Sequence, residues 1–347
     1  MAQRPRVTVL GSLNTDISLP VPHLPGPGET VLAAGSATFG AGGKGANQAV
    51  AAARLGASVQ MAGCCGDDEF GARLRAGLTA EGVGVAGLRA LPGVASGLAL
   101  ITVDPAGENS IAVAPGANGL AGDAEVAAAF AQPCDVLVMS AEIPAAVLGA
   151  ALRRARAEGV RTVLNLAPVP EGADGLLAEC PDWLVVNAQE AAALTGRPAH
   201  GVPGQARVGG AGDAAGVPAE SAGAPGKDAA GAPGNDAAGA QAVAAALAGG
   251  PGGGHVVVTL GAAGAVLAGP WGTAAVPGFR VSAVDTVAAG DAFVGALAVA
   301  LASGLAPAKA VTAACAAGAA AATRRGAQAA LPRPADVLAA TGFTWPA

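Results

Sequence analysis

The chain has 347 residues, of which 52% are hydrophobic but only 3% are aromatic, and its formal net charge is −6. A negatively charged chain without a basic, aromatic-rich patch is not expected to bind nucleic acid. The longest apolar run, residues 292–305, is too short to cross a membrane, and polar residues interrupt any signal-peptide core near the N-terminus. We therefore expect a cytoplasmic protein with no membrane partner.

The cysteine pattern argues against a zinc site. The five cysteines form no CxxC pair and have no histidine at metal-ligand spacing. Their odd number in a chain of this length indicates reduced thiols. With no tyrosine and few other aromatic residues, the core must be built from Val, Leu and Ala.

The predicted elements, taken in chain order, alternate between strands and helices. A buried strand at 7–10 is followed by apolar patterns that predict further strands at 59–62, 136–139, 161–166, 183–186 and 256–260. Helical patterns lie between them at 46–55, 70–80, 145–158 and 189–194, and a hairpin follows at 264–268 and 273–276. Repeated βα units with short links predict an α/β fold with a doubly wound, mostly parallel sheet and helices on both faces.

Residues 198–238 interrupt this rhythm. They consist largely of Gly, Ala, Pro and Asp, with a near-exact octapeptide repeat at 223–230 and 231–238. Such a segment cannot bury enough apolar surface to offset the entropy of ordering it. We expect a disordered surface insertion, with a helix resuming at 239–248.

The segment from Asp285 to Phe293 carries the strongest chemical signal. It lies between a β-type run at 279–284 and an apolar helix at 293–305. A small-residue turn that opens a helix leaves backbone N–H groups free to bind an anion. Asp291 lies within this turn, where a carboxylate could accept a proton from an attacking hydroxyl. It could equally be a helix cap, and the residues of this segment alone leave both interpretations open.

A second glycine-rich segment, residues 40–47, fits GxGxxG by count but is not a dinucleotide site. It does not close a first strand of a βαβ unit, and no acidic residue follows at the ribose position. It is not a Walker A loop either, because Gly45 follows Lys44. Gly42 and Gly43 would let the backbone approach a polar ligand, and Lys44 and Asn47 would supply donors, which suits a polyhydroxylated small molecule. The alternative is a tight turn with a surface lysine.

Other polar residues follow predicted strands, where open α/β sheets place their ligands. Asn14 and Asp16 follow the first strand, and Glu142 follows the strand at 136–139. Residues 187–190 begin with Asn and end with Glu, which is either a capping box or a site where Glu190 holds Mg²⁺ through water. Residues 259–264 are either a simple turn or a loop beside a nucleotide.

Taken together and in this order, these motifs resemble the ribokinase family of carbohydrate kinases over nearly the whole chain. The most specific stretches are GGKGANQAVAAARLGA from Gly42 and VDTVAAGDAFVGAL from Val284. The resemblance implies one domain over 1–342, with a small β-sheet lid from strands at about 12–19, 29–40 and 94–114. It implies ATP-dependent phosphorylation of D-ribose at O5 with Mg²⁺, activation by K⁺, and a homodimer formed through the lid.

The resemblance also implies roles for individual residues. Asp291 would be the general base, with the backbone amides of Ala289, Gly290 and Asp291 as the anion hole and Glu190 organising Mg²⁺ through water. The sugar would be held by Asn14, Asp16, Gly43, Lys44, Asn47, Glu142 and Asp291. ATP would be contacted by Asn187, Thr259, Leu260, Gly261, Gly264, Gly290 and Cys315. The K⁺ loop would use Asp285, Val287, Ala321, Arg324, Gly326 and Ala330.

Two residues depart from the family pattern. Ala330 stands where these kinases often have a hydroxyl near the monovalent cation, which leaves the need for K⁺ open. Cys315 stands where the adenine pocket usually has a polar residue, which leaves base selectivity open. Two other functions remain: a sister kinase acting on deoxyribose, fructose or adenosine, and a non-catalytic sugar-binding protein. The second is disfavoured because a pure binder would need neither Asp291 nor Glu190.

Overall fold

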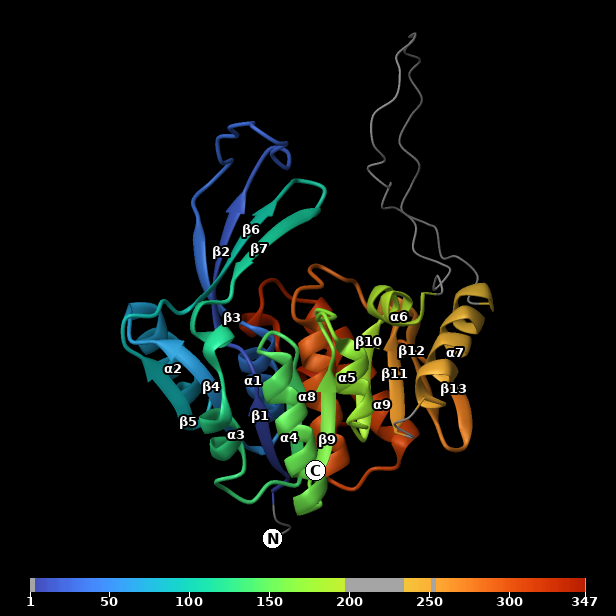
Figure 1. Ribbon diagram of the computed structural model, residues 1–347. Coiled ribbons are helices and arrows are strands. Elements are labelled where there is room, and N and C mark those ends of the chain that lie inside the picture. Colours follow the sequence, from blue (N-terminus) through green and yellow to red (C-terminus); the bar gives the residue numbers. More distant parts are fainter. Residues whose placement is uncertain (1–3, 197–233, 251–253, 347) are drawn as a thin grey trace, which may run out of the picture.

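The computed structural model is organised around one nine-stranded sheet with helices on both faces (Figure 1). It describes residues 4–196, 234–250 and 254–346. In spatial order the strands are β13 (Gly272–Pro277), β12 (Gly264–Gly269), β11 (His255–Thr259), β10 (Trp183–Asn187), β9 (Arg161–Asn165), β8 (Val136–Ser140), β1 (Arg6–Leu10), β4 (Ser58–Gly66) and β5 (Gly84–Leu91). The strands from β11 to β5 run parallel, and β12 and β13 are added antiparallel at one edge.

The helices divide into two layers because alternate strand residues point to opposite faces of the sheet. Val136 and Val138 of β8 face one core, and Leu137 and Met139 face the other. The first core is covered by α1 (Lys44–Arg54), α2 (Glu69–Ala80), α8 (Ala289–Ala302), α9 (Pro307–Ala322) and α10 (Pro334–Thr341). The second is covered by α3 (Asp123–Ala129), α4 (Ala145–Glu158), α5 (Ala173–Ala178), α6 (Ala188–Thr195) and α7 (Gly234–Ala248).

A second, four-stranded sheet rises beyond the carboxyl ends of the parallel strands (Figure 1). Its order is β3 (Thr38–Gly42), β2 (Asn14–Pro20), β6 (Gly97–Val103) and β7 (Asn109–Ala114). The chain passes from β1 through residues 11–13 into β2, so the small sheet is connected directly to an interior strand of the large one. This position agrees with the lid that the resemblance implied.

The doubly wound sheet is confirmed, with local corrections. The strand expected at 279–284 is wrong: Val284 N–H donates to Ala322 O at 2.8 Å, and the Phe279 ring packs edge-on against Phe343 instead of extending the sheet. The strand expected at 29–40 is confined to its end, in β3. Strand β5 and helices α3, α5, α9 and α10 were not predicted.

Only the last residues of the expected insertion, 234–238, belong to the described part of the chain. Helix α7 begins at Gly234, so the last residues of the 198–238 segment are helical and that part of the expectation is wrong. The remainder of the segment, 198–233, lies outside the described residues. None of the helices in the described ranges combines the length and apolar character that a membrane span requires.

Close approach of α1 and α8 depends on one glycine. A Cβ atom on Gly295 would lie 2.7 Å from Ala51 Cβ and 2.8 Å from Gln48 O. The neighbouring atoms are an alanine Cβ and a backbone oxygen, and neither can move aside without a shift of the α1 backbone. This approach brings the N-terminal ends of α1 and α8 together.

We therefore expect Gly295→Ala to lower the free energy of unfolding by about 1–3 kcal/mol, the usual cost of overpacking. Gly77 in α2 is the matched control, because a Cβ atom there meets nothing within 4 Å. Gly77→Ala should raise the free energy of unfolding by about 0.5–1 kcal/mol, since alanine is the better helix former. Urea unfolding measures both. Equal effects of the two substitutions would contradict the packing argument.

Candidate active site

The two most specific sequence stretches meet at one carboxylate. Asn47 Nδ2 donates to Asp291 Oδ2 at 2.9 Å, and Gln48 Nε2 donates to Asp291 Oδ1 at 3.1 Å. Asp291 is only 7% exposed. The capping interpretation of Asp291 is wrong, because the residue at the N-cap of α8 is Ala288 and the Asp291 side chain turns away to α1.

The surroundings of Asp291 suit a base. Burial raises its pKa, while Lys44 and the hydrogen bonds from Asn47 and Gln48 act in the opposite direction. The first turn of α8 adds backbone donors: Ala289 N–H is directed to Thr286 O at 3.2 Å, so Gly290 and Asp291 are the better candidates for an anion. Space above Gly290 is open, since a Cβ atom there would meet nothing within 4 Å.

The glycines of the 40–47 segment serve packing within the protein. A Cβ atom on Gly42 would lie 2.0 Å from Asp16 Oδ2, and one on Gly43 would lie 2.7 Å from the backbone nitrogen of Asn14. Gly43 also has φ 87°, which L side chains rarely adopt. The glycines therefore admit strand β2 and its side chains. Their contact with a sugar stays a prediction.

Three carboxylates act on Lys44. Burial alone would lower the pKa of Lys44, but Asp291, Glu142 and Glu190 together raise it. Burial, with the negative charges of Glu142 and Asp291, raises the pKa of Asp16 to about 7. Asn14, Asp16, Lys44, Asn47, Glu142 and Asp291 are thus brought to one end of the sheet, as the resemblance implied.

Three buried polar residues of this region were not predicted. Ser12 Oγ donates to Glu142, which also accepts from Lys44 N–H at 3.0 Å. Asn118 Nδ2 donates to Asn14 Oδ1 at 2.8 Å and so orients that side chain. Gln48 lies inside the quoted GGKGANQAV stretch, and its place next to Asn47 at the start of an apolar run was the signal that could have found it. For Asn118 the surrounding residues offered no signal.

The predicted nucleotide side lies at the next strand ends. Asn187 and Glu190 form a reciprocal capping box, with hydrogen bonds of 2.7 and 2.8 Å. Burial raises the pKa of Glu190, and the charge of Lys44 opposes this, so the carboxylate is within electrostatic reach of the site. The capping interpretation is therefore confirmed, and a role with Mg²⁺ stays a prediction.

Of the other predicted ATP contacts, Thr259 ends β11 and residues 261–263 form a short 3₁₀ turn. Leu260 N–H donates to Gly264 O at 2.8 Å across this turn. A Cβ atom on Gly264 would lie 2.2 Å from Val276 O, so hairpin packing also requires this glycine. Cys315 packs into the core from α9, and burial raises its thiol pKa to about 12. Its contact with ATP stays a prediction.

Three of the residues predicted for K⁺ are joined by hydrogen bonds. The Asp285 carboxylate accepts from Val287 N–H at 3.0 Å and from Gly326 N–H at 2.9 Å, and Asp285 N–H donates to Ala322 O. Arg324 is paired with Asp336. Ala321 and Ala330 are fully buried. Within the ranges described, no group of three or more His, Cys, Asp or Glu side chains could hold a metal ion.

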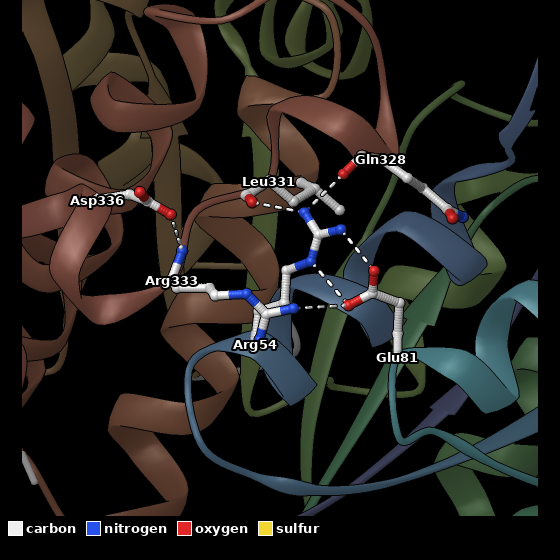
Figure 2. A network of polar contacts seen from close by, with 6 residues as sticks. All are labelled: Arg54, Glu81, Gln328, Leu331, Arg333 and Asp336. Carbon is white, nitrogen blue, oxygen red and sulfur yellow. Dashed lines mark hydrogen bonds and ion pairs between the residues drawn. The ribbon is translucent and has the colours of Figure 1, made fainter.

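Arg54 anchors residues 324–331, the loop that follows α9 and contains several of the residues predicted for K⁺ (Figure 2). Its guanidinium donates to both oxygens of Glu81, at 2.6 and 2.9 Å, and to the carbonyls of Gln328 and Leu331, each at 2.7 Å. The hydrogen bond from Arg54 lowers the pKa of Glu81. Arg333 reaches Glu81 only at 3.3 Å. The loop is therefore tied to the ends of α1 and α2.

The fold and the site define a class: an open α/β protein with a buried carboxylate at a helix N-terminus, facing a small second sheet. Known proteins that resemble this chain in sequence and structure are sugar kinases. The chain is 34% identical to the ribokinase of Haemophilus influenzae over 96% of this chain and 98% of that one. It is 33% identical to the ribokinase of Schizosaccharomyces pombe, covering 94% of each. A crystal structure of ribokinase from Cryptococcus neoformans in complex with ADP is 28% identical, with TM-score 0.76, covering 97% of this chain and 99% of that one.

The family itself is also matched. Residues 4–214 and 226–334 fit the pfkB family of carbohydrate kinases. The chain belongs to this family. The α/β fold described above is therefore the fold of a carbohydrate kinase.

The Arg54 contacts make a stability prediction. Arg54→Met should lower the free energy of unfolding by about 3 kcal/mol, because Glu81 and two carbonyls would lose their main partner. Arg333→Met is the matched control and should change it by less than about 1 kcal/mol, since Arg333 is 61% exposed. Urea unfolding measures both, and hydrogen exchange at 324–331 should speed up only in the first variant. Similar values for the two would show that Arg54 does not anchor the loop.

Proposed function

We propose that this protein transfers the γ-phosphoryl group of ATP to O5 of D-ribose. The observation that carries the proposal is the Asp291 carboxylate, buried beside Lys44 and held by Asn47 and Gln48 at the N-terminus of α8. Relatives named ribokinase match the chain over nearly its full length. The substrate and the phosphate donor are taken from these names and from the ADP complex.

The sugar is proposed to bind between β2 and the start of α1. Asn14, Asp16, Lys44, Asn47 and Glu142 offer both acceptors and donors there, and Gly43 carries the turn between them. Directional partners of this kind discriminate strongly, because an analogue that lacks one hydroxyl leaves buried polar groups unpaired. The hydroxyl at O5 would lie against Asp291.

The reaction is proposed as an in-line displacement. Asp291 accepts the O5 proton while O5 forms its bond to the γ-phosphorus, and the bond from that phosphorus to the β–γ bridging oxygen breaks, releasing ADP. The backbone amides of Gly290 and Asp291 would face the charge that develops on the phosphoryl oxygens, and Ala289 would join them only if its N–H left Thr286 O. Residues 187 and 259–264, with Cys315, would contact ATP.

Two cations are part of the proposal. Glu190 would hold Mg²⁺ through water, which suits an ion that keeps much of its hydration, and the ion would supply positive charge beside the phosphates of ATP. K⁺ would lie at the loop of Asp285, Val287, Ala321, Arg324, Gly326 and Ala330, mostly on carbonyls. Ala330 supplies no hydroxyl, so the dependence on K⁺ is to be measured and not assumed.

The small sheet is proposed to be a lid that also joins two copies of the chain. Ile17 lies opposite both Phe39 and Leu100, so these three share one face of the sheet, and Asp16 points to the other face. Phe39 is 61% exposed and Leu100 is 50% exposed. An apolar face that points away from the sugar fits a second copy of the same sheet.

Asp291→Asn should lower kcat by about 10²–10⁴-fold, the usual range for loss of a general base, while ribose still binds. The measurement is ADP release with Mg-ATP and ribose, with and without K⁺. Asp174→Asn is the control, because Asp174 is an exposed carboxylate in the first turn of another helix, α5.

The same assay separates the alternatives. Faster turnover of deoxyribose, fructose or adenosine than of ribose would keep the mechanism and replace the substrate. Ribose binding without ADP release would favour a binding protein. Near-normal turnover by Asp291→Asn would overturn the assignment of the base.

A further inference from the structure

Gln48 connects Asp291 to the centre of the large sheet. Its side chain is fully buried on α1, and Nε2 donates both to Asp291 Oδ1, at 3.1 Å, and to Asn165 Oδ1, at 3.0 Å. Asn165 ends β9, and its Nδ2 donates to Val185 O of β10 at 3.2 Å. A continuous chain of hydrogen bonds therefore runs from two strands, through Gln48, to the carboxylate.

This geometry leaves Gln48 nothing to donate to a substrate. An amide nitrogen has two hydrogens, and both are used. The side chain is also 0% exposed, so a sugar or a phosphate does not reach it. Any influence of Gln48 on the reaction must therefore pass through Asp291.

The two oxygens of Asp291 are held separately. Asn47 takes Oδ2 and Gln48 takes Oδ1, so the carboxylate cannot rotate without breaking one of these bonds. Asn47 is also a proposed sugar contact. Asn47 Oδ1 and Gln48 Oε1 both lack a hydrogen-bond partner among the described residues. Gln48 differs because its second bond leads into the sheet and not toward the sugar.

We infer that Gln48 is a positioning residue that fixes the plane of the Asp291 carboxylate and keeps it ready to accept a proton. This inference rests on the proposed function, in which Asp291 is the general base. The competing explanation is that Gln48 merely satisfies buried polar groups in the core. A purely structural role would change stability but not the titration of Asp291.

The charge balance gives the sign of the expected effect. Burial raises the pKa of Asp291, and the donors Asn47 and Gln48 oppose this together with Lys44. The carboxylates of Glu142 and Asp16 also face this group and favour its protonated form. Losing the Gln48 donor removes a bond to the ionised form, so the pKa of Asp291 should rise further.

The test is Gln48→Met, which keeps a side chain of similar length but has no donor. We expect kcat for ribose to fall about 10- to 100-fold, the value of one hydrogen bond to a charged group. KM values for ribose and ATP should stay within about threefold, since no substrate contact is removed. The acid limb of the kcat/KM profile should move to higher pH by about one unit.

Two controls distinguish a positioning role of Gln48 from a role in core packing alone. Gln60→Met makes the same change on a half-buried side chain of β4 and should leave the pH profile unchanged. In an Asp291→Ala background, Gln48→Met should cost little more activity, because Gln48 acts only through the missing carboxylate. A full additional loss in that background would contradict the inference.

A measurement without turnover keeps this inference distinct from the proposed function. The pKa of Asp291 can be followed by NMR of ¹³C-labelled aspartate carboxyls, assigned with Asp291→Asn, in the wild type and in Gln48→Met. A higher pKa in the variant supports the positioning role even if ribose proves not to be the substrate. An unchanged pKa with only a lower melting temperature would overturn it, whatever the activity of the wild type.

Discussion

The contact on which this structure depends is the pair of amide hydrogen bonds to the Asp291 carboxylate. A buried carboxylate is costly unless donors and positive charge surround it. Here Asn47 and Gln48 bring the donors on α1, Lys44 brings the charge, and the N-terminus of α8 adds its dipole. Segments more than 240 residues apart in sequence are thereby required to meet at the carboxyl ends of the parallel strands.

The high content of Ala and Gly lets these helices pack closely around Asp291. Helices α8 and α9 are rich in Ala and Gly, and nearly every residue of α8 after its first turn is buried. Small side chains let α1, α8 and α9 approach closely. Gly295 of α8 packs against Ala51 of α1, and a Cβ atom on Gly318 of α9 would lie only 3.1 Å from Ala289 O. Larger aromatic side chains would separate these helices and move Asp291 away from its donors. The low aromatic content is therefore consistent with the site.

The βα rhythm could be predicted from sequence because each central strand is a short apolar run between turn residues. The local pattern was misleading at 279–284, where Phe279 packs on Phe343 and Val284 is exposed. It also did not reveal β5, which is half exposed at the sheet edge. The motifs predicted that Asn47, Glu142 and Asp291 lie together at one end of the sheet. The bonds of Gln48 and Asn118 were not predictable, because the partner of a buried amide is set by tertiary packing and has no local signature.

The central claim is that Asp291 faces the hydroxyl that is phosphorylated. The most direct measurement is a crystal structure of the protein with D-ribose and an unreactive ATP analogue, with Mg²⁺ present. The account predicts ribose O5 within about 2.6–3.2 Å of an Asp291 carboxylate oxygen, with the γ-phosphate at the first turn of α8. Ribose bound with O5 turned away from Asp291, or the γ-phosphate bound elsewhere, would contradict it.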